Sequence, residues 1–119
     1  MTKATRAVGA YGERLAAQHL IEAGMVLLAR NWRCRIGEID IVARDGDAVV
    51  FCEVKTRRGV GYGPPAEAVV AAKARRLRQL GAQWLKDHGV RPDEVRFDVV
   101  SVLPQRGGGA RVEHLRGAF

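Results

Sequence analysis

Two runs of β-branched and other apolar residues flank the turn sequence Asp45-Gly46-Asp47, at residues 37–44 and 48–56. Their side chains alternate as in β-strands, and Gly and Asp tolerate the backbone angles of tight hairpin turns. The two runs therefore predict an antiparallel hairpin. Both alternating sets of the second run are largely apolar, so we expect that strand to lie inside a sheet with both faces covered.

The segments around this hairpin predict the rest of the fold. Residues 5–24 and 66–88 carry apolar side chains at three- and four-residue spacings, as amphipathic helices do. Further strands are predicted at residues 25–32, 95–103 and 111–115. The order of these elements predicts an α/β fold in which helices flank a mixed β-sheet.

Length and charge restrict the class of protein. A chain of 119 residues fits one domain, residues 1–119, because two halves would each be too small for a stable core. Twenty Lys and Arg against thirteen Asp and Glu give a net charge of +7, which favours phosphate-rich partners. No apolar stretch approaches the ~20 residues that cross a bilayer. We expect a cytoplasmic protein with no membrane contact.

Polar residues interrupt the apolar hairpin, among them Asp40 in the first strand and Glu53 and Lys55 in the second. Residues two apart on a strand project from one face, so Glu53 and Lys55 are neighbours. A turn centred on Asp45-Gly46 or on Gly46-Asp47 brings Asp40 to that face, and the second turn places Asp40 directly opposite Glu53. A three-residue loop would send Asp40 to the other face.

Opposed carboxylates repel each other unless a positive charge lies between them, and hard divalent cations prefer oxygen ligands. Asp40 and Glu53 are therefore a candidate site for Mg²⁺ or Mn²⁺, with Lys55 placed to orient or activate a water molecule. The alternative is an exposed strand face with ordinary ion pairs, worth about 0.2 to 1 kcal/mol each. Val49 and Phe51 share the face, which indicates partial burial and favours a site.

The hairpin sequences also resemble those of a known family. Residues 37–43 (Gly-Glu-Ile-Asp-Ile-Val-Ala) and 50–57 (Val-Phe-Cys-Glu-Val-Lys-Thr-Arg) are similar to the YraN family of small bacterial proteins. That family is placed in the restriction-endonuclease-like superfamily, with the archaeal Holliday-junction resolvases among its relatives. The resemblance covers nearly the whole chain, including Gly12-Glu13, Gly63-Pro64, Lys73 and Arg96-Phe97-Asp98. It implies a restriction-endonuclease-like fold.

The superfamily pattern is an acid on a helix, an aspartate on one strand and Glu-x-Lys on the next. It is matched here by Glu13, Asp40, Glu53 and Lys55, although Ile39 replaces the proline that precedes the aspartate in the superfamily. The resemblance implies an endonuclease that hydrolyses DNA, branched DNA included, with Mg²⁺ or Mn²⁺. The alternative is a module that binds nucleic acid or a partner protein in a DNA-processing assembly without catalysis. A homodimer is left open.

Basic residues near these positions are candidate DNA contacts, although such a run is usually a solvated helix face. They are Arg57, Arg58, Lys73, Arg75, Arg76 and Arg78.

A few other polar residues have structural interpretations as well. Glu38 could extend the metal site or form a salt bridge at the strand edge. Arg96 and Asp98, two apart on one strand, predict a structural ion pair. The three histidines, His19, His88 and His114, are interpreted as surface or capping residues.

Overall fold

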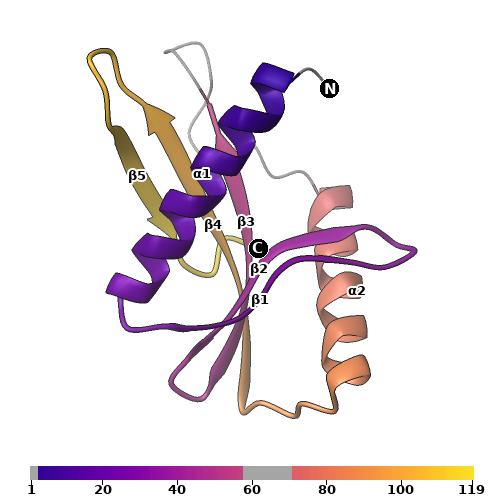
Figure 1. Cartoon of the computed structure of the whole chain (residues 1–119). Helices are drawn as coiled ribbons and strands as arrows, with labels where there is room; N and C mark the ends of the chain where they lie inside the picture. The colour runs from indigo at the N-terminus through magenta and orange to yellow at the C-terminus, as the bar shows by residue number, and fades with distance from the viewer. Residues whose placement is uncertain (1–2, 58–70) are drawn as a thin grey trace.

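Five strands form one sheet in the order β1-β2-β3-β4-β5 in the computed structural model, which describes residues 3–57 and 71–119 (Figure 1). The strands are β1 Val26–Arg33, β2 Glu38–Asp45, β3 Ala48–Thr56, β4 Glu94–Pro104 and β5 Ala110–Leu115. Neighbouring strands are antiparallel except β3 and β4, which are parallel. This mixed sheet confirms the predicted α/β class and is consistent with a restriction-endonuclease-like fold.

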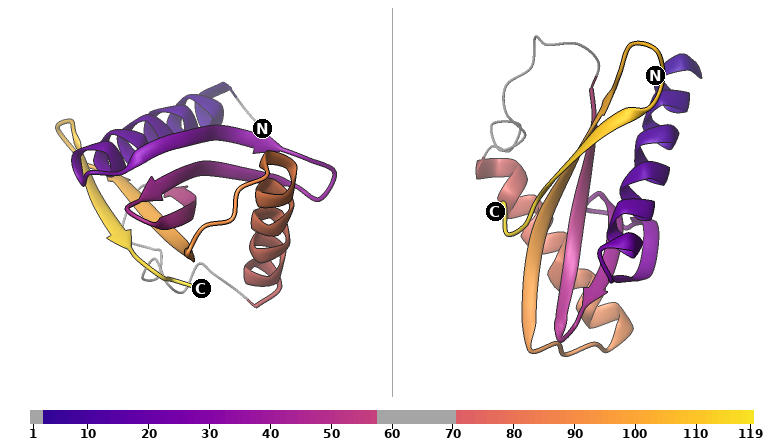
Figure 2. Two further views of the ribbon diagram at one scale, coloured as in Figure 1. Left: turned by 90° about the horizontal axis from the view of Figure 1, so that it is seen from below. Right: turned by 90° about the vertical axis from the view of Figure 1, so that its left-hand side faces the viewer.

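Two helices cover opposite faces of the sheet, α1 Lys3–Glu22 and α2 Ala71–His88 (Figure 2). Because β3 and β4 are parallel, the chain between them must return along the sheet, and α2 lies in this crossover. Both predicted helices are confirmed where the structure describes them. Residues 66–70 of the second prediction lie outside the described residues.

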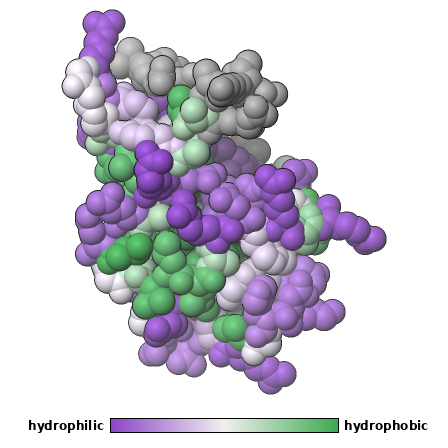
Figure 3. Space-filling model, viewed as in Figure 1, coloured by the Kyte–Doolittle hydropathy of each residue, from purple (hydrophilic) through white to green (hydrophobic). Residues whose placement is uncertain are grey.

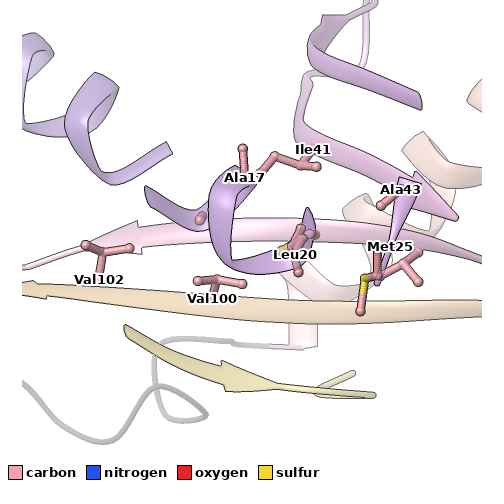
Figure 4. Packing of buried hydrophobic residues seen from close by; sticks show 10 residues of the cluster. Ala17, Leu20, Met25, Ile41, Ala43, Val100 and Val102 are labelled. Carbon is pink, nitrogen blue, oxygen red and sulfur yellow. The ribbon is translucent and has the colours of Figure 1, made fainter. Parts of the chain in front are cut away.

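The core has one layer under each helix. Strand β3 supplies Val50 and Cys52 to the layer beneath α1, and Val49 and Phe51 to the layer beneath α2. Figure 4 shows the layer beneath α1. The other buried members of the first layer are Ala16, Ala17, Leu20, Met25, Ile41, Ala43, Val100 and Val102. The prediction that this strand is central with both faces covered is therefore confirmed.

The end of α1 fixes how the chain enters the sheet. Gly24, with φ of +94°, and Met25 donate backbone hydrogen bonds of 3.0 Å to the carbonyls of Ile21 and Leu20. This is the Schellman arrangement, which needs a residue that tolerates the left-handed conformation. Met25 and Leu20 are both buried in the layer beneath α1, so the same turn starts β1 in contact with the core.

The surface in Figure 3 is mostly hydrophilic, with a hydrophobic patch near the lower end of α1. Exposed large hydrophobic side chains of this region include Ile21 in α1 and Val26 and Leu28 in β1. Among the described residues, neither helix has the length and apolar character to cross a membrane.

Candidate functional site

The hairpin register brings the predicted acidic residues together. Asp45 pairs with Ala48 and Ile41 pairs with Cys52, so the turn consists of Gly46 and Asp47. Gly46 has φ of +61°, a conformation that glycine adopts without strain. This is the second of the two predicted registers. Continued by one residue, it places Asp40 opposite Glu53.

The backbone ladder between β2 and β3 ends at Ile41 and Cys52. The next bond joins a side chain to the backbone, because the Val54 N–H donates to Asp40 Oδ2 at 2.8 Å. In Figure 1 the β1–β2 hairpin leaves the rest of the sheet in this region. Asp40 therefore lies where β2 and β3 separate, and its carboxylate takes the place of a strand carbonyl.

Helix α1 brings Glu13 to the same place because Gly12 allows close packing. A Cβ atom added to Gly12 would lie 1.7 Å from Thr56 Oγ1, so no larger residue fits without moving the helix or β3. Carboxylate oxygens of Glu13, Glu38 and Asp40 lie within 4.8 Å of one another. Glu38 also accepts a hydrogen bond of 2.6 Å from Arg33 Nε, which confirms the predicted salt bridge.

Glu53 has different partners. Its Oε1 atom lies 3.1 Å from Lys55 Nζ and 2.5 Å from Lys73 Nζ, and only 15% of its side chain is exposed. The predicted proximity of Glu53 and Lys55 is confirmed. Lys73, predicted only as a DNA contact, reaches this position from the first turn of α2, which spacing along the sequence could not reveal.

Burial and the surrounding charges perturb the acid–base behaviour of the site. Burial raises the pKa of Asp40 to about 7. The Val54 hydrogen bond opposes this rise, and the charges of Glu53, Glu13 and Glu38 add to it. Burial and the neighbouring Lys73 lower the pKa of Lys55. Gathering these groups therefore costs electrostatic free energy.

Two cavities meet at Glu38 and Asp40. The α2-side cavity, of about 450 Å³, is also lined by Glu53 and Lys73, with the other walls formed by Gly37, Cys52, Ala72, Arg76, Leu77 and Leu80. The α1-side cavity, of about 600 Å³, is also lined by Glu13 and Lys55, with the other walls formed by Val8, Gly9, Ala10, Asn31, Arg33, Val54 and Thr56. Asp40 therefore borders a cavity on each side of the sheet.

The remaining basic residues lie around this site rather than in it. Arg75, Arg76 and Arg78 are exposed on α2, and Arg76 borders the α2-side cavity. Arg57 continues from β3 with its backbone N–H bonded to the Val102 carbonyl. The predicted contact Arg58 lies outside the described residues.

A second buried polar cluster lies on β4. The predicted Arg96–Asp98 pair is confirmed, with Arg96 Nε 2.9 Å from Asp98 Oδ1. The interpretation of His114 as a surface or capping residue is wrong, because its Nε2 donates to Asp98 Oδ2 at 2.8 Å and its side chain is 7% exposed. His19 stacks edge-on against His114, with ring centroids 5.4 Å apart. A buried aspartate in an apolar strand was the available signal.

The sequence profile of the Uncharacterised protein family UPF0102 matches residues 12–102, which include the whole candidate site. The chain belongs to UPF0102, the YraN family. UPF0102 proteins from Acidothermus cellulolyticus and a Parafrankia species are both 56% identical to it, covering 98% of this chain and 96% and 99% of their own. One from Rhodococcus jostii is 55% identical over 95% of this chain and 96% of its own. The predicted resemblance is confirmed.

Proposed function

We propose that this UPF0102 protein binds DNA and hydrolyses its phosphodiester bonds as an endonuclease that uses Mg²⁺ or Mn²⁺. The observation that supports this most is the convergence of the carboxylates of Glu13, Glu38 and Asp40 within 4.8 Å. Lys55 lines the cavity that these acids share. An acidic cluster with an adjacent ammonium group on an open cavity suits attack of water on a phosphate.

The acidic residues fit a hard divalent cation. Their donor atoms are carboxylate oxygens, which Mg²⁺ and Mn²⁺ prefer. The raised pKa of Asp40 reports that burial and mutual repulsion disfavour its charge, and a cation would offset that cost. Asp40, with Glu13 and Glu38, would hold the ion. Such an ion, when bound, lowers the pKa of a water ligand and neutralises charge on a phosphate.

The protein groups around the ion site have separate parts in the reaction. The Val54 N–H fixes one oxygen of Asp40 and so orients the carboxylate. Lys55 lines the same cavity as these acids, so its ammonium group would contact the phosphate under attack and stabilise the transition state. Exposed arginines of α2 would contact phosphates on either side and position the strand.

A second candidate function is a nucleic-acid- or protein-binding module without catalysis. It is favoured by the ion pairs of Glu53, which is already neutralised by Lys55 and Lys73. That part of the cluster is electrostatically satisfied without an ion. The two functions differ in whether DNA is cut, so a cleavage assay separates them.

We expect Asp40→Asn to remove both cleavage and metal binding. The asparagine can still accept the Val54 hydrogen bond, so the fold should persist while the charge is lost. Loss of residues that merely support a metal ligand costs 10- to 100-fold, so loss of a ligand should lower Mn²⁺ affinity at least ~100-fold. Calorimetry with Mn²⁺, and incubation with labelled branched, single-stranded and duplex DNA plus Mg²⁺ or Mn²⁺, measure the two effects.

The matched control is Asp47→Asn, which removes an exposed carboxylate from the hairpin turn. This variant should bind metal and cleave as the unmodified protein does. Equal Mn²⁺ binding by Asp40→Asn and the unmodified protein would contradict the site. Absence of cleavage on every substrate, together with DNA binding, would favour the binding module.

We expect the double change Arg75→Ala and Arg76→Ala to weaken DNA binding equally for all sequences, because phosphate contacts carry no base information. Each lost contact to duplex DNA should reduce the slope of log affinity against log salt by about 0.9. Fluorescence anisotropy over a series of KCl concentrations, without divalent metal, measures this slope. The control is Arg106→Ala, which changes an exposed arginine in the turn between β4 and β5. An unchanged slope in the double variant would mean that the basic side chains of α2 only face solvent and do not contact DNA.

A further inference from the structure

Lys73 is not one of the four residues that match the superfamily pattern. It nevertheless lies closer to Glu53, which is one of the four, than Lys55 does. It is in the first turn of α2, and its Nζ is 2.5 Å from Glu53 Oε1. Lys55 Nζ is 3.1 Å from the same oxygen. One carboxylate oxygen in β3 therefore has two ammonium donors, one from its own strand and one from α2, the crossover helix between β3 and β4.

This arrangement makes Glu53 a poor ligand for a cation. With one carboxylate and two ammonium groups, the cluster of Glu53, Lys55 and Lys73 has a net charge of +1 and repels a positive ion. A metal would also have to displace a short, charge-assisted hydrogen bond from Oε1. The carboxylates of Glu13, Glu38 and Asp40 face no comparable pair of ammonium groups among the described contacts, apart from the exposed Arg33 beside Glu38.

Backbone geometry alone would not keep Glu53 away from the ion. Continued by one residue, the register of β2 and β3 places Glu53 opposite Asp40, and both residues line the α2-side cavity. Glu53 nevertheless contributes no oxygen to the group formed by Glu13, Glu38 and Asp40. Its Oε1 atom contacts two lysines instead, and the helix-borne Lys73 is the closer.

We propose that Lys73 is a positioning residue that holds Glu53 away from the metal and leaves Glu13, Glu38 and Asp40 as the carboxylates that bind it. This inference rests on the proposed metal-dependent function. It assigns Glu38 the ligand place that the opposed carboxylates of the hairpin predicted for Glu53. Because Lys73 alone can neutralise Glu53, it also leaves Lys55 available for a substrate phosphate.

The test is Mn²⁺ calorimetry on the full chain and three variants: Glu53→Gln, Lys73→Met and the two changes combined. In the otherwise unmodified protein, Glu53→Gln should change the Mn²⁺ dissociation constant less than about threefold. Lys73→Met should tighten binding, because Glu53 is then free to turn to the ion. In the Lys73→Met background, Glu53→Gln should weaken binding by at least about threefold. The dependence on Glu53 should thus appear only when Lys73 is absent.

Arg76→Met is the matched control, since Arg76 lines the same cavity but forms no ion pair with Glu53 in the described part of the chain. It removes a nearby positive charge and should leave the effect of Glu53→Gln small. Lys73→Arg keeps the charge and should behave as the unmodified protein. Both results would show that the effect comes from the contact between Lys73 and Glu53, and not from a general change in the electrostatic potential of the cavity.

Glu53→Gln alone decides the main point without any change to α2. If it weakens Mn²⁺ binding as much as Asp40→Asn does, Glu53 is itself a ligand and the inference on Lys73 is overturned, while the proposed endonuclease function stands. If the unmodified protein binds no Mn²⁺, the metal-dependent function and this inference both fail.

Discussion

Lys55→Met is expected to slow DNA cleavage about 100- to 1000-fold while the fold, metal affinity and DNA affinity stay nearly unchanged. The aliphatic part of the side chain is kept, which suits a position whose lysine is only 22% exposed. Glu53 retains Lys73 as a partner, so the change leaves no unpaired carboxylate. The change should therefore slow the chemical step of cleavage and leave folding and binding nearly intact.

The physical reason is where the Lys55 charge acts. Lys55 lines the α1-side cavity together with Glu13 and Asp40, the residues proposed to hold the metal. Negative charge grows on the phosphate as water attacks, so an ammonium group there binds the transition state more strongly than the ground state. Removing such an interaction lowers the catalytic rate with little effect on substrate affinity.

Single-turnover cleavage with labelled DNA measures the rate, and thermal melts with and without Mn²⁺ measure stability. Lys86→Met, an exposed lysine at the far end of α2, is the control for loss of a positive charge and should cleave normally. Undiminished cleavage by Lys55→Met would refute the catalytic role. A lowered melting temperature only without metal would instead assign Lys55 the role of a counter-ion.

The hairpin could be predicted because its information is local. Strand side chains alternate with a period of two, so the turn at Gly46-Asp47 determines the face of every residue in both strands. That rule predicts Asp40 opposite Glu53 and Glu53 beside Lys55. The structure keeps this register as far as Ile41 and Cys52, and Glu53 contacts Lys55. Burial on both faces of β3 also followed from its sequence alone.

Contacts between distant elements could not be obtained in this way. Lys73 belongs to a basic run along α2, and charge and spacing within that run do not distinguish it from Arg75 or Arg76. Its contact with Glu53 depends on how the crossover seats the helix against β3. The grouping of Glu13 with Glu38 likewise depends on the close packing of α1 at Gly12, which follows from the three-dimensional contact with Thr56.

The buried polar cluster on β4 includes one contact that the sequence predicts locally and one that depends on the pairing of distant strands. Arg96 and Asp98 are two apart on one strand, so their pair could be predicted. His114 is 16 residues from Asp98 and meets it because β5 pairs with β4. An aspartate inside the apolar run of β4 indicates buried partners, because an isolated buried charge is too costly. The register of β5 determines which residue becomes the partner of Asp98 from that strand.

Asp98 accepts hydrogen bonds on both carboxylate oxygens. Arg96 donates two, of 2.9 and 3.1 Å, and His114 Nε2 and the Gly117 N–H donate at 2.8 and 3.0 Å. Arg96 Nη1 also contacts Asp45 Oδ2 at 3.0 Å, which connects β4 to the β2–β3 hairpin. The side chain of Asp98 is fully buried, so these bonds form away from water. The cluster thus joins three parts of the sheet.

We expect Asp98→Asn to lower the free energy of unfolding by about 3 to 5 kcal/mol, the cost of removing one partner from a buried ion pair. The asparagine has nearly the same shape, but its amide NH₂ must point at one of the donors that surrounded the carboxylate. Arg96 also loses its buried anion. Urea unfolding monitored by circular dichroism measures the change, with Glu113→Gln as the control. Glu113 pairs with Arg111 at 3.1 Å on the surface of β5, so its loss should cost less than about 1 kcal/mol.

The effect of Asp98 should also depend on pH. Burial alone would raise the pKa of Asp98, but the bonds from His114, Arg96 and Gly117 outweigh it and hold that pKa below the ordinary value of 3.8. A carboxyl group with a lowered pKa in the folded state stabilises the protein at neutral pH and loses that contribution as pH falls through the lowered pKa. The difference in unfolding free energy between the unmodified protein and Asp98→Asn should therefore be full at pH 7 and begin to shrink only below about pH 4. A difference that already shrinks between pH 7 and pH 5 would contradict the lowered pKa of Asp98.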